Sequence, residues 1–123
     1  MWLMTEKGFV SVVEHRDDPD TLIVRARVPE DLKGLGLEVS EFNKDADYRY
    51  RTYISRAYFA HIVMTAVMDL NYTNFKSACP DNRQEIYLSV WSTLIELEDL
   101  ESPSQKTRAS RRFYNGDARH GED

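Results

Sequence analysis

The chain has 123 residues, 41% of them hydrophobic and 30% charged, and a net charge of −5. This length and this balance are typical of one globular domain and exclude disorder along the whole chain. The negative charge disfavours general binding to nucleic acid, because the phosphate backbone repels an acidic surface. The single cysteine, Cys79, excludes an intramolecular disulfide and a cysteine-rich zinc site, and it favours a reducing environment.

No segment predicts a secretion signal or a membrane span. Residues 1–6 are not basic and are too short for a signal peptide. The longest mostly apolar stretch, residues 57–70, contains His61 and Asp69 and falls short of the roughly 20 residues that cross a bilayer. We therefore expect a cytoplasmic protein that makes no contact with a membrane.

The first 28 residues predict a meander of three antiparallel strands. Segments 2–5 and 9–15 are rich in β-prone residues and flank a tight turn that contains Gly8. Residues 21–28 alternate strictly, so that Leu22, Val24, Ala26 and Val28 share one face.

The remaining elements follow from helix signals and further alternation. Pro29 begins a short helix that Gly34 and Gly36 end. Residues 37–42 and 47–55 alternate and predict two more strands. Ser55 caps a long helix, and a second long helix follows Pro80. Its apolar stripe runs from Tyr87 to Leu97, and the acidic residues at its end predict fraying.

This order, β-β-β-α-β-β-α-α, predicts an α+β fold. We expect an antiparallel sheet of about five strands with the two long helices packed on one face. The single domain should span residues 1–101. Residues 102–123 are polar and slightly basic, with Lys106, Arg108, Arg111 and Arg112 close together, and they predict a disordered tail.

Residues 1–98 contain five short sequence blocks. They are Met1-Trp2 with residues 8–13, residues 24–27 with Asp31-Leu32, residues 46–51, residues 72–76 and residues 87–91. Together these blocks resemble a family of small proteins of bacteria, their plasmids and their phages, for which no activity is established. The resemblance implies a biological context and no mechanism. It also implies a histidine at position 88, where this chain has leucine.

Arginines on two predicted strands are the main candidate site. Arg25 and Arg27 share one strand face, and Arg49 and Arg51 share another, with Tyr53 beside them. If the two strands are neighbours, four guanidinium groups form a patch that suits carboxylates or phosphates. The alternative is a solvated face on which these arginines pair with Glu14, Glu38 or Asp47.

Other clusters have a simpler structural interpretation. Asn74 and Lys76 lie in a loop that is a second candidate site, but Asn74 could instead cap the preceding helix in a left-handed conformation. Tyr48 and Tyr50 could stack nucleobases, but the alternation places them on the core side. The acidic turn around Asp18 lacks the spacing of a calcium loop, and no histidine pair has metal-ligand spacing. We expect no metal and no cofactor.

The chain carries no P-loop, no G-x-G-x-x-G and no G-x-S-x-G motif, which favours a non-enzymatic protein. The first hypothesis is an interaction protein of a phage or mobile element that binds a host protein, for example a defence complex whose basic groove an acidic surface could occupy. The second is an anion- or nucleotide-binding domain that uses the four arginines. The third is nucleic-acid binding through the basic tail.

Overall fold

The computed structural model describes residues 1–101 and confirms the predicted α+β fold class. Five strands form one sheet in the order β1-β2-β3-β5-β4, and every neighbouring pair is antiparallel. The strands are β1 (Trp2–Thr5), β2 (Gly8–Glu14), β3 (Thr21–Ala26), β4 (Glu41–Phe42) and β5 (Tyr50–Ser55).

The helices divide between two compact units, one that spans Met1–Cys79 and one that begins at Pro80. The first unit contains the sheet with α1 (Pro29–Lys33), α2 (Arg56–Met68) and α3 (Phe75–Ala78). In the second unit, the described residues form α4 (Asp81–Leu94) and the 3₁₀ helix η1 (Ile95–Glu101). The single domain over residues 1–101 stays a prediction, and the predicted tail, with its basic cluster from Lys106 to Arg112, lies outside the described residues.

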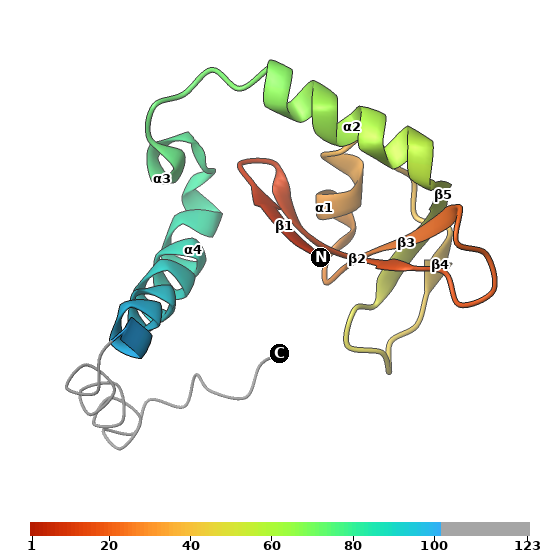
Figure 1. Cartoon of the computed structure of the whole chain (residues 1–123), viewed down its shortest axis with the longest axis horizontal. Coiled ribbons are helices and arrows are strands. Elements are labelled where there is room, and N and C mark those ends of the chain that lie inside the picture. The colour runs from red at the N-terminus through yellow and green to blue at the C-terminus, as the bar shows by residue number, and fades with distance from the viewer. Residues whose placement is uncertain (102–123) are drawn as a thin grey trace. The chain divides into compact units, whose positions relative to one another are not determined.

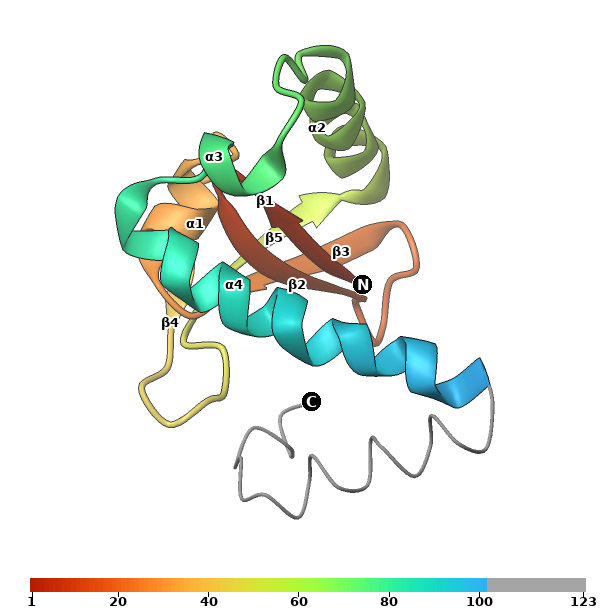
Figure 2. The ribbon, with the colours of Figure 1, turned by 90° about the vertical axis from the view of Figure 1, so that its left-hand side faces the viewer.

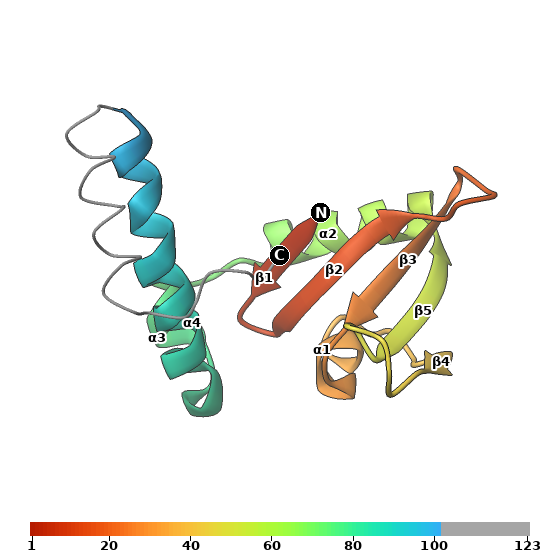
Figure 3. The same cartoon turned by 90° about the horizontal axis from the view of Figure 1, so that it is seen from below.

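Helices α1 and α2 cover one face of the sheet. Figure 1 views the sheet nearly edge-on with both helices above it, and Figure 3 looks from below onto the opposite face. The core lies between them and contains Val10, Val12, Leu22, Val24, Ala26, Leu32, Leu37, Ile54 and Phe59. Within Met1–Cys79, no helix packs on the other face of the sheet.

Short-range signals explain where several elements begin. The Ser55 hydroxyl accepts a hydrogen bond from the Tyr58 N–H at 3.1 Å, so the predicted cap of α2 is confirmed. Gly8 begins β2 with a φ of +144°. The buried carboxylate of Asp31 in α1 accepts a hydrogen bond from the Phe9 N–H at 2.9 Å, which fastens α1 to β2.

The strand predicted over residues 37–42 is mostly wrong, since only Glu41 and Phe42 pair with β5. The Leu37 N–H bonds to the carbonyl of Leu32 at 3.0 Å, so the chain still follows the end of α1 there. The side chain of Leu37 is buried in the core. Tertiary burial has therefore overridden the alternating pattern.

Val28 also departs from its prediction. β3 ends at Ala26, and Val28 becomes the residue that precedes α1, with 38% of its surface exposed. The reason is Pro29, which favours an extended conformation at the residue before it and begins the helix.

In the second unit, α4 and η1 form one continuous helical rod (Figure 2). The regular α-helix ends at Leu94, close to the acidic residues where fraying was predicted. Of the predicted apolar stripe, Tyr87 is buried, whereas Trp91, Leu94 and Leu97 are 51%, 54% and 59% exposed.

Candidate anion-binding sheet face

A row of side chains crosses all five strands on the face of the sheet opposite α1 and α2. We call this surface the arginine face. The register aligns Trp2 with Ser11, Ser11 with Arg25, Arg25 with Arg51, and Arg51 with Glu41. Because side chains alternate along each strand, these residues face away from the core that their neighbours build. From β1 to β4, the row therefore presents an aromatic ring, a hydroxyl group, two cations and an anion.

Arg25 and Arg51 are directly opposite each other in the β3–β5 pair, so the two arginine-bearing strands are neighbours in the sheet. Opposed residues of an antiparallel pair have Cβ atoms roughly 4.5–5.5 Å apart, and like charges at that distance repel. Both side chains are half-buried. The guanidinium of Arg25 donates hydrogen bonds to the Ser11 hydroxyl at 2.6 Å and to the Ser11 carbonyl at 3.5 Å.

Arg25 and Arg27 both stack on the ring of Tyr48. Their guanidinium carbons lie 4.8 Å and 4.5 Å from the ring centroid. Cations at this distance are attracted to the ring face. Tyr48 is buried as predicted, but it precedes β5 and lies outside the main core cluster, beneath the two arginines. Tyr50, by contrast, packs against the core as predicted.

The alternative prediction, in which these arginines pair with carboxylates, is contradicted. Glu14 pairs with Arg56 at 2.5 Å, a contact that strand alternation could not reveal because Arg56 is the first residue of α2. Arg27 donates to the backbone carbonyl of Asp47 at 3.0 Å rather than to its carboxylate. Within residues 1–101, none of Arg25, Arg27, Arg49 and Arg51 forms an ion pair.

Arg49 is exposed and immediately precedes β5. Its carbonyl accepts a hydrogen bond from the Asn43 N–H at 2.9 Å, which closes the β4–β5 connection. The structure thus brings Arg25, Arg27 and Arg51 together through direct pairing and a shared tyrosine, and it places Arg49 two residues from Arg51 along the chain.

Tyr53 lies on the same face and is 44% exposed. Its hydroxyl donates a hydrogen bond to a Glu41 carboxylate oxygen at 2.7 Å, and its ring contacts His15 edge-on at 5.9 Å between centroids. The hydrogen bond to Glu41 raises the pKa of Tyr53 above its ordinary value, since it stabilises the protonated phenol. Sequence reasoning missed Ser11 and Glu41, which only the strand register could have identified.

The second candidate consists of Asn74, which immediately precedes α3, and Lys76, which lies within α3. Asn74 has a φ of −139°, and its side chain accepts a hydrogen bond from the Ser77 N–H at 3.0 Å. It therefore caps the helix that follows, and the predicted left-handed cap of the preceding helix is wrong. Lys76 is exposed within α3.

The acidic turn between β2 and β3 satisfies its own polar groups. The carboxylate of Asp18 accepts hydrogen bonds from the Thr21 hydroxyl at 2.7 Å and the Asp20 N–H at 3.0 Å. The bond from Thr21 is the main reason that the pKa of Asp18 is lowered. Among residues 1–101, no group of three or more histidine, cysteine or acidic side chains has the geometry to hold a metal ion. No helix in that range is long and apolar enough to cross a bilayer.

Comparisons with known proteins give no relative for this arrangement. No protein-family model matches the chain, and no curated protein or solved structure matches it either.

Proposed function

We propose that the chain is a non-enzymatic interaction protein whose arginine face binds an acidic segment of a partner protein. The observation that carries this proposal is the direct opposition of Arg25 and Arg51 without any carboxylate paired to either guanidinium in the described residues. Two like charges fixed opposite each other destabilise the strand pair, and a bound carboxylate between them relieves that repulsion.

The composition of the row favours a protein segment over a polyphosphate. Glu41 stands opposite Arg51 at the edge of the sheet, and its negative charge repels a polyphosphate, which is charged at every unit, more strongly than a peptide segment that places one carboxylate between the two arginines. Trp2 and Tyr53 are 57% and 44% exposed on this face and provide amphipathic aromatic area of the kind enriched at protein interfaces.

The biological setting of this proposal rests on the resemblance described above. A family of bacterial, plasmid and phage proteins implies a mobile element as the source and a cytoplasmic host protein as the partner. An acidic segment is the part of such a partner that the arginine face would recognise.

A synthetic peptide of about ten residues with glutamate at alternate positions tests the recognition step. We expect it to bind at low salt and to weaken as salt is added, because exposed charge pairs are screened. The variant R49A/R51A should lose about tenfold or more in affinity, measured by fluorescence polarisation, since charge-assisted contacts contribute about 1.5–3 kcal/mol each. These two arginines are chosen because Arg25 and Arg27 also cover Tyr48.

The matched control is K33A, which removes one positive charge from α1 on the opposite face of the sheet. Its affinity for the peptide should stay within about twofold of the wild type. Equal losses in K33A and R49A/R51A, or no binding by the wild type, would overturn the proposal. Tighter binding of ATP than of the peptide would overturn it in favour of the nucleotide hypothesis.

A further inference from the structure

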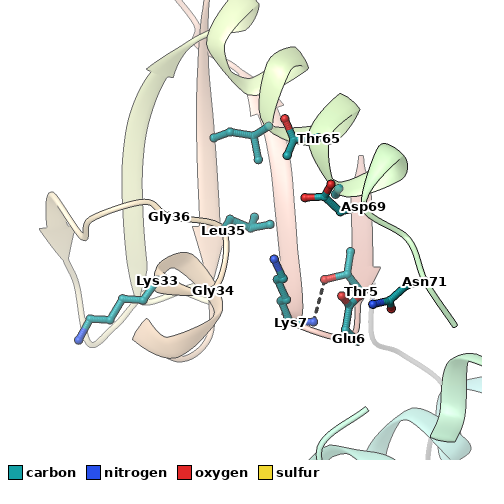
Figure 4. Close-up of a pocket in the computed structure, with 12 residues that line it drawn as sticks. Thr5, Glu6, Lys7, Lys33, Gly34, Leu35, Gly36, Thr65, Asp69 and Asn71 are labelled. Carbon is teal, nitrogen blue, oxygen red and sulfur yellow. Dashed lines mark hydrogen bonds between the residues drawn. The ribbon is translucent and has the colours of Figure 1, made fainter. Parts of the chain in front are cut away.

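A pocket of about 620 Å³ opens on the helix side of the sheet, away from the arginine face. It lies entirely within Met1–Cys79. Its walls are the turn between β1 and β2, the glycine-containing loop after α1, and the last turns of α2 (Figure 4). The volume falls in the range of small-molecule sites, about 300–1,000 Å³.

The wall formed by the loop and the turn is built by close backbone packing. A Cβ added to Gly34 would lie 2.7 Å from the carbonyl oxygen of Lys7, so only glycine allows the loop to approach the turn this closely. The turn is held by the Thr5 hydroxyl, which accepts a hydrogen bond from the Lys7 N–H at 3.0 Å. The rim of the pocket is therefore fixed by the fold.

Opposite charges enter the pocket from two different walls. Figure 4 shows the side chains of Lys7 and Asp69 directed into the space between the loop and α2, whereas the side chain of Lys33, which is also a lining residue, points away from it. Neither Lys7 nor Asp69 forms an ion pair within residues 1–101. An ammonium group and a carboxylate thus face one cavity without neutralising each other.

The surroundings of Asp69 add to its preference for a cation. Asp69 is the C-terminal cap of α2, and the end of a 13-residue helix carries partial negative charge from its free carbonyls. Glu6, the other acidic residue of the lining, interacts with Tyr72, whose pKa is raised first by burial and then by the charge of Glu6. Asp69 is therefore the group that we assign to a cationic ligand atom.

We infer that this pocket binds a small zwitterion, namely an amino acid or a short peptide with an apolar side chain. The ligand carboxylate lies on the ammonium of Lys7, and the ligand ammonium lies on Asp69 beside the end of α2. Leu35, Ile62 and Ala66 line the same pocket and provide an apolar surface for the ligand side chain. This site is separate from the arginine face and does not depend on the proposed function.

Leucine and the dipeptide Leu-Leu are the probes. Their binding to the full chain is measured by two-dimensional NMR. We expect one of them to shift the amide signals of Leu35, Thr65 and Asn71 at concentrations up to about 10 mM, a range in which small ligands with few contacts bind. Comparison of the two probes distinguishes a free amino acid from a peptide terminus. N-acetylleucine and leucinamide, which lack the ammonium and the carboxylate respectively, should bind about tenfold or more weakly than leucine.

The variants K7Q and D69N should each weaken binding of the better probe about tenfold or more, because each removes a charge-assisted contact. Both side chains are exposed, so the fold should survive, and thermal unfolding checks this. K33Q is the matched control and should bind within about twofold of the wild type. The inference is overturned if leucine and Leu-Leu shift no pocket signal, if N-acetylleucine and leucinamide bind as well as leucine, or if K33Q matches K7Q.

Discussion

Gly8 lies where the first hairpin meets α1, and its missing side chain makes room for a carboxylate. Its φ of +144° is unfavourable for residues with a side chain. A Cβ at this position would lie 2.5 Å from Oδ1 and 2.6 Å from Cγ of Asp31. Asp31 is fixed in turn by its hydrogen bond from the Phe9 N–H, so it cannot move aside without breaking this partly buried bond.

The substitution G8A should therefore destabilise the fold by about 2–4 kcal/mol, through backbone strain and overpacking together. Urea unfolding followed by circular dichroism measures the free energy of unfolding. The control is G36A, whose φ is +79° but whose added Cβ would meet no atom within 4 Å. G36A should cost only about 1–2 kcal/mol, the strain of the left-handed conformation. Equal effects of the two substitutions would refute the role assigned to Asp31.

At the same scale, the sequence reveals which residues share a strand face but not what each side chain touches. Alternation alone places Arg25 and Arg27 on one face of β3. It could not show that both cover Tyr48, because that tyrosine precedes β5 and is not aligned with either arginine by the strand register. It also missed the ion pair of Arg56 with Glu14, which joins residues 42 positions apart.

Among the elements, β4 is the shortest strand, and a side-chain contact holds it at the sheet edge. Only Glu41 and Phe42 pair with β5. The Tyr53 hydroxyl bonds to the Glu41 carboxylate, and the Phe42 ring packs on the Tyr50 ring at 4.9 Å between centroids. An edge strand of two residues needs such contacts, because its backbone bonds alone are few.

The pKa of Tyr53 depends on its hydrogen bond to Glu41. It is raised above the ordinary value of 10.0, chiefly by the hydrogen bond to Glu41, so the neutral phenol is favoured in the folded state. The stability that this hydrogen bond provides is fully present when the pH is below the pKa of Tyr53 in the unfolded chain. It is lost as the pH rises through the higher pKa of Tyr53 in the folded protein. In E41Q, the pKa of Tyr53 should fall toward 10.0, as measured by NMR titration of the Tyr53 ring.

The matched control is E38Q, which removes an exposed carboxylate from the same segment, and Tyr53 should titrate in it as in the wild type. R51A should raise the pKa of Tyr53 further, since Arg51 acts against Glu41. An unchanged titration in E41Q would contradict the assigned hydrogen bond.

Elements with strong local signals are predictable from the sequence, and the others are not. The first hairpin, α1 and the cap of α2 follow from Gly8, Pro29 and Ser55, each of which acts within a few residues. Residues 37–39 alternate as in a strand, but their burial is decided by contact with distant parts of the core. Asn74 gives an ambiguous signal because asparagine caps either end of a helix.

For the whole molecule, the two compact units raise the question of where the cooperative domain ends. Every residue of the buried core cluster lies between Val10 and Phe59, inside the first unit. A fragment of residues 1–79 should therefore unfold cooperatively. Its thermal midpoint should lie within about 4–8 °C of the full chain, a difference that corresponds to about 1 kcal/mol for a domain of this size.

Calorimetry of the fragment and of the full chain gives the two thermal midpoints to be compared. Loss of a cooperative transition in the fragment would show that residues 80–101 belong to the same domain, as the sequence predicts. The sequence could not locate a division at Cys79, because α4 carries the same amphipathic signal whether it packs on the sheet or not.

The position of β3 in the sheet has a consequence for how the chain folds. On one side β3 pairs with β2, its neighbour in the sequence, and on the other with β5, so residues 27–49 must form a loop before the sheet is complete. Hairpins form in about 1–10 μs, whereas a closure at this separation has an additional entropic cost. That closure also brings Arg25 against Arg51, and the ionic strength of the solution should therefore affect the rate of this step more than the rate of forming the first hairpin.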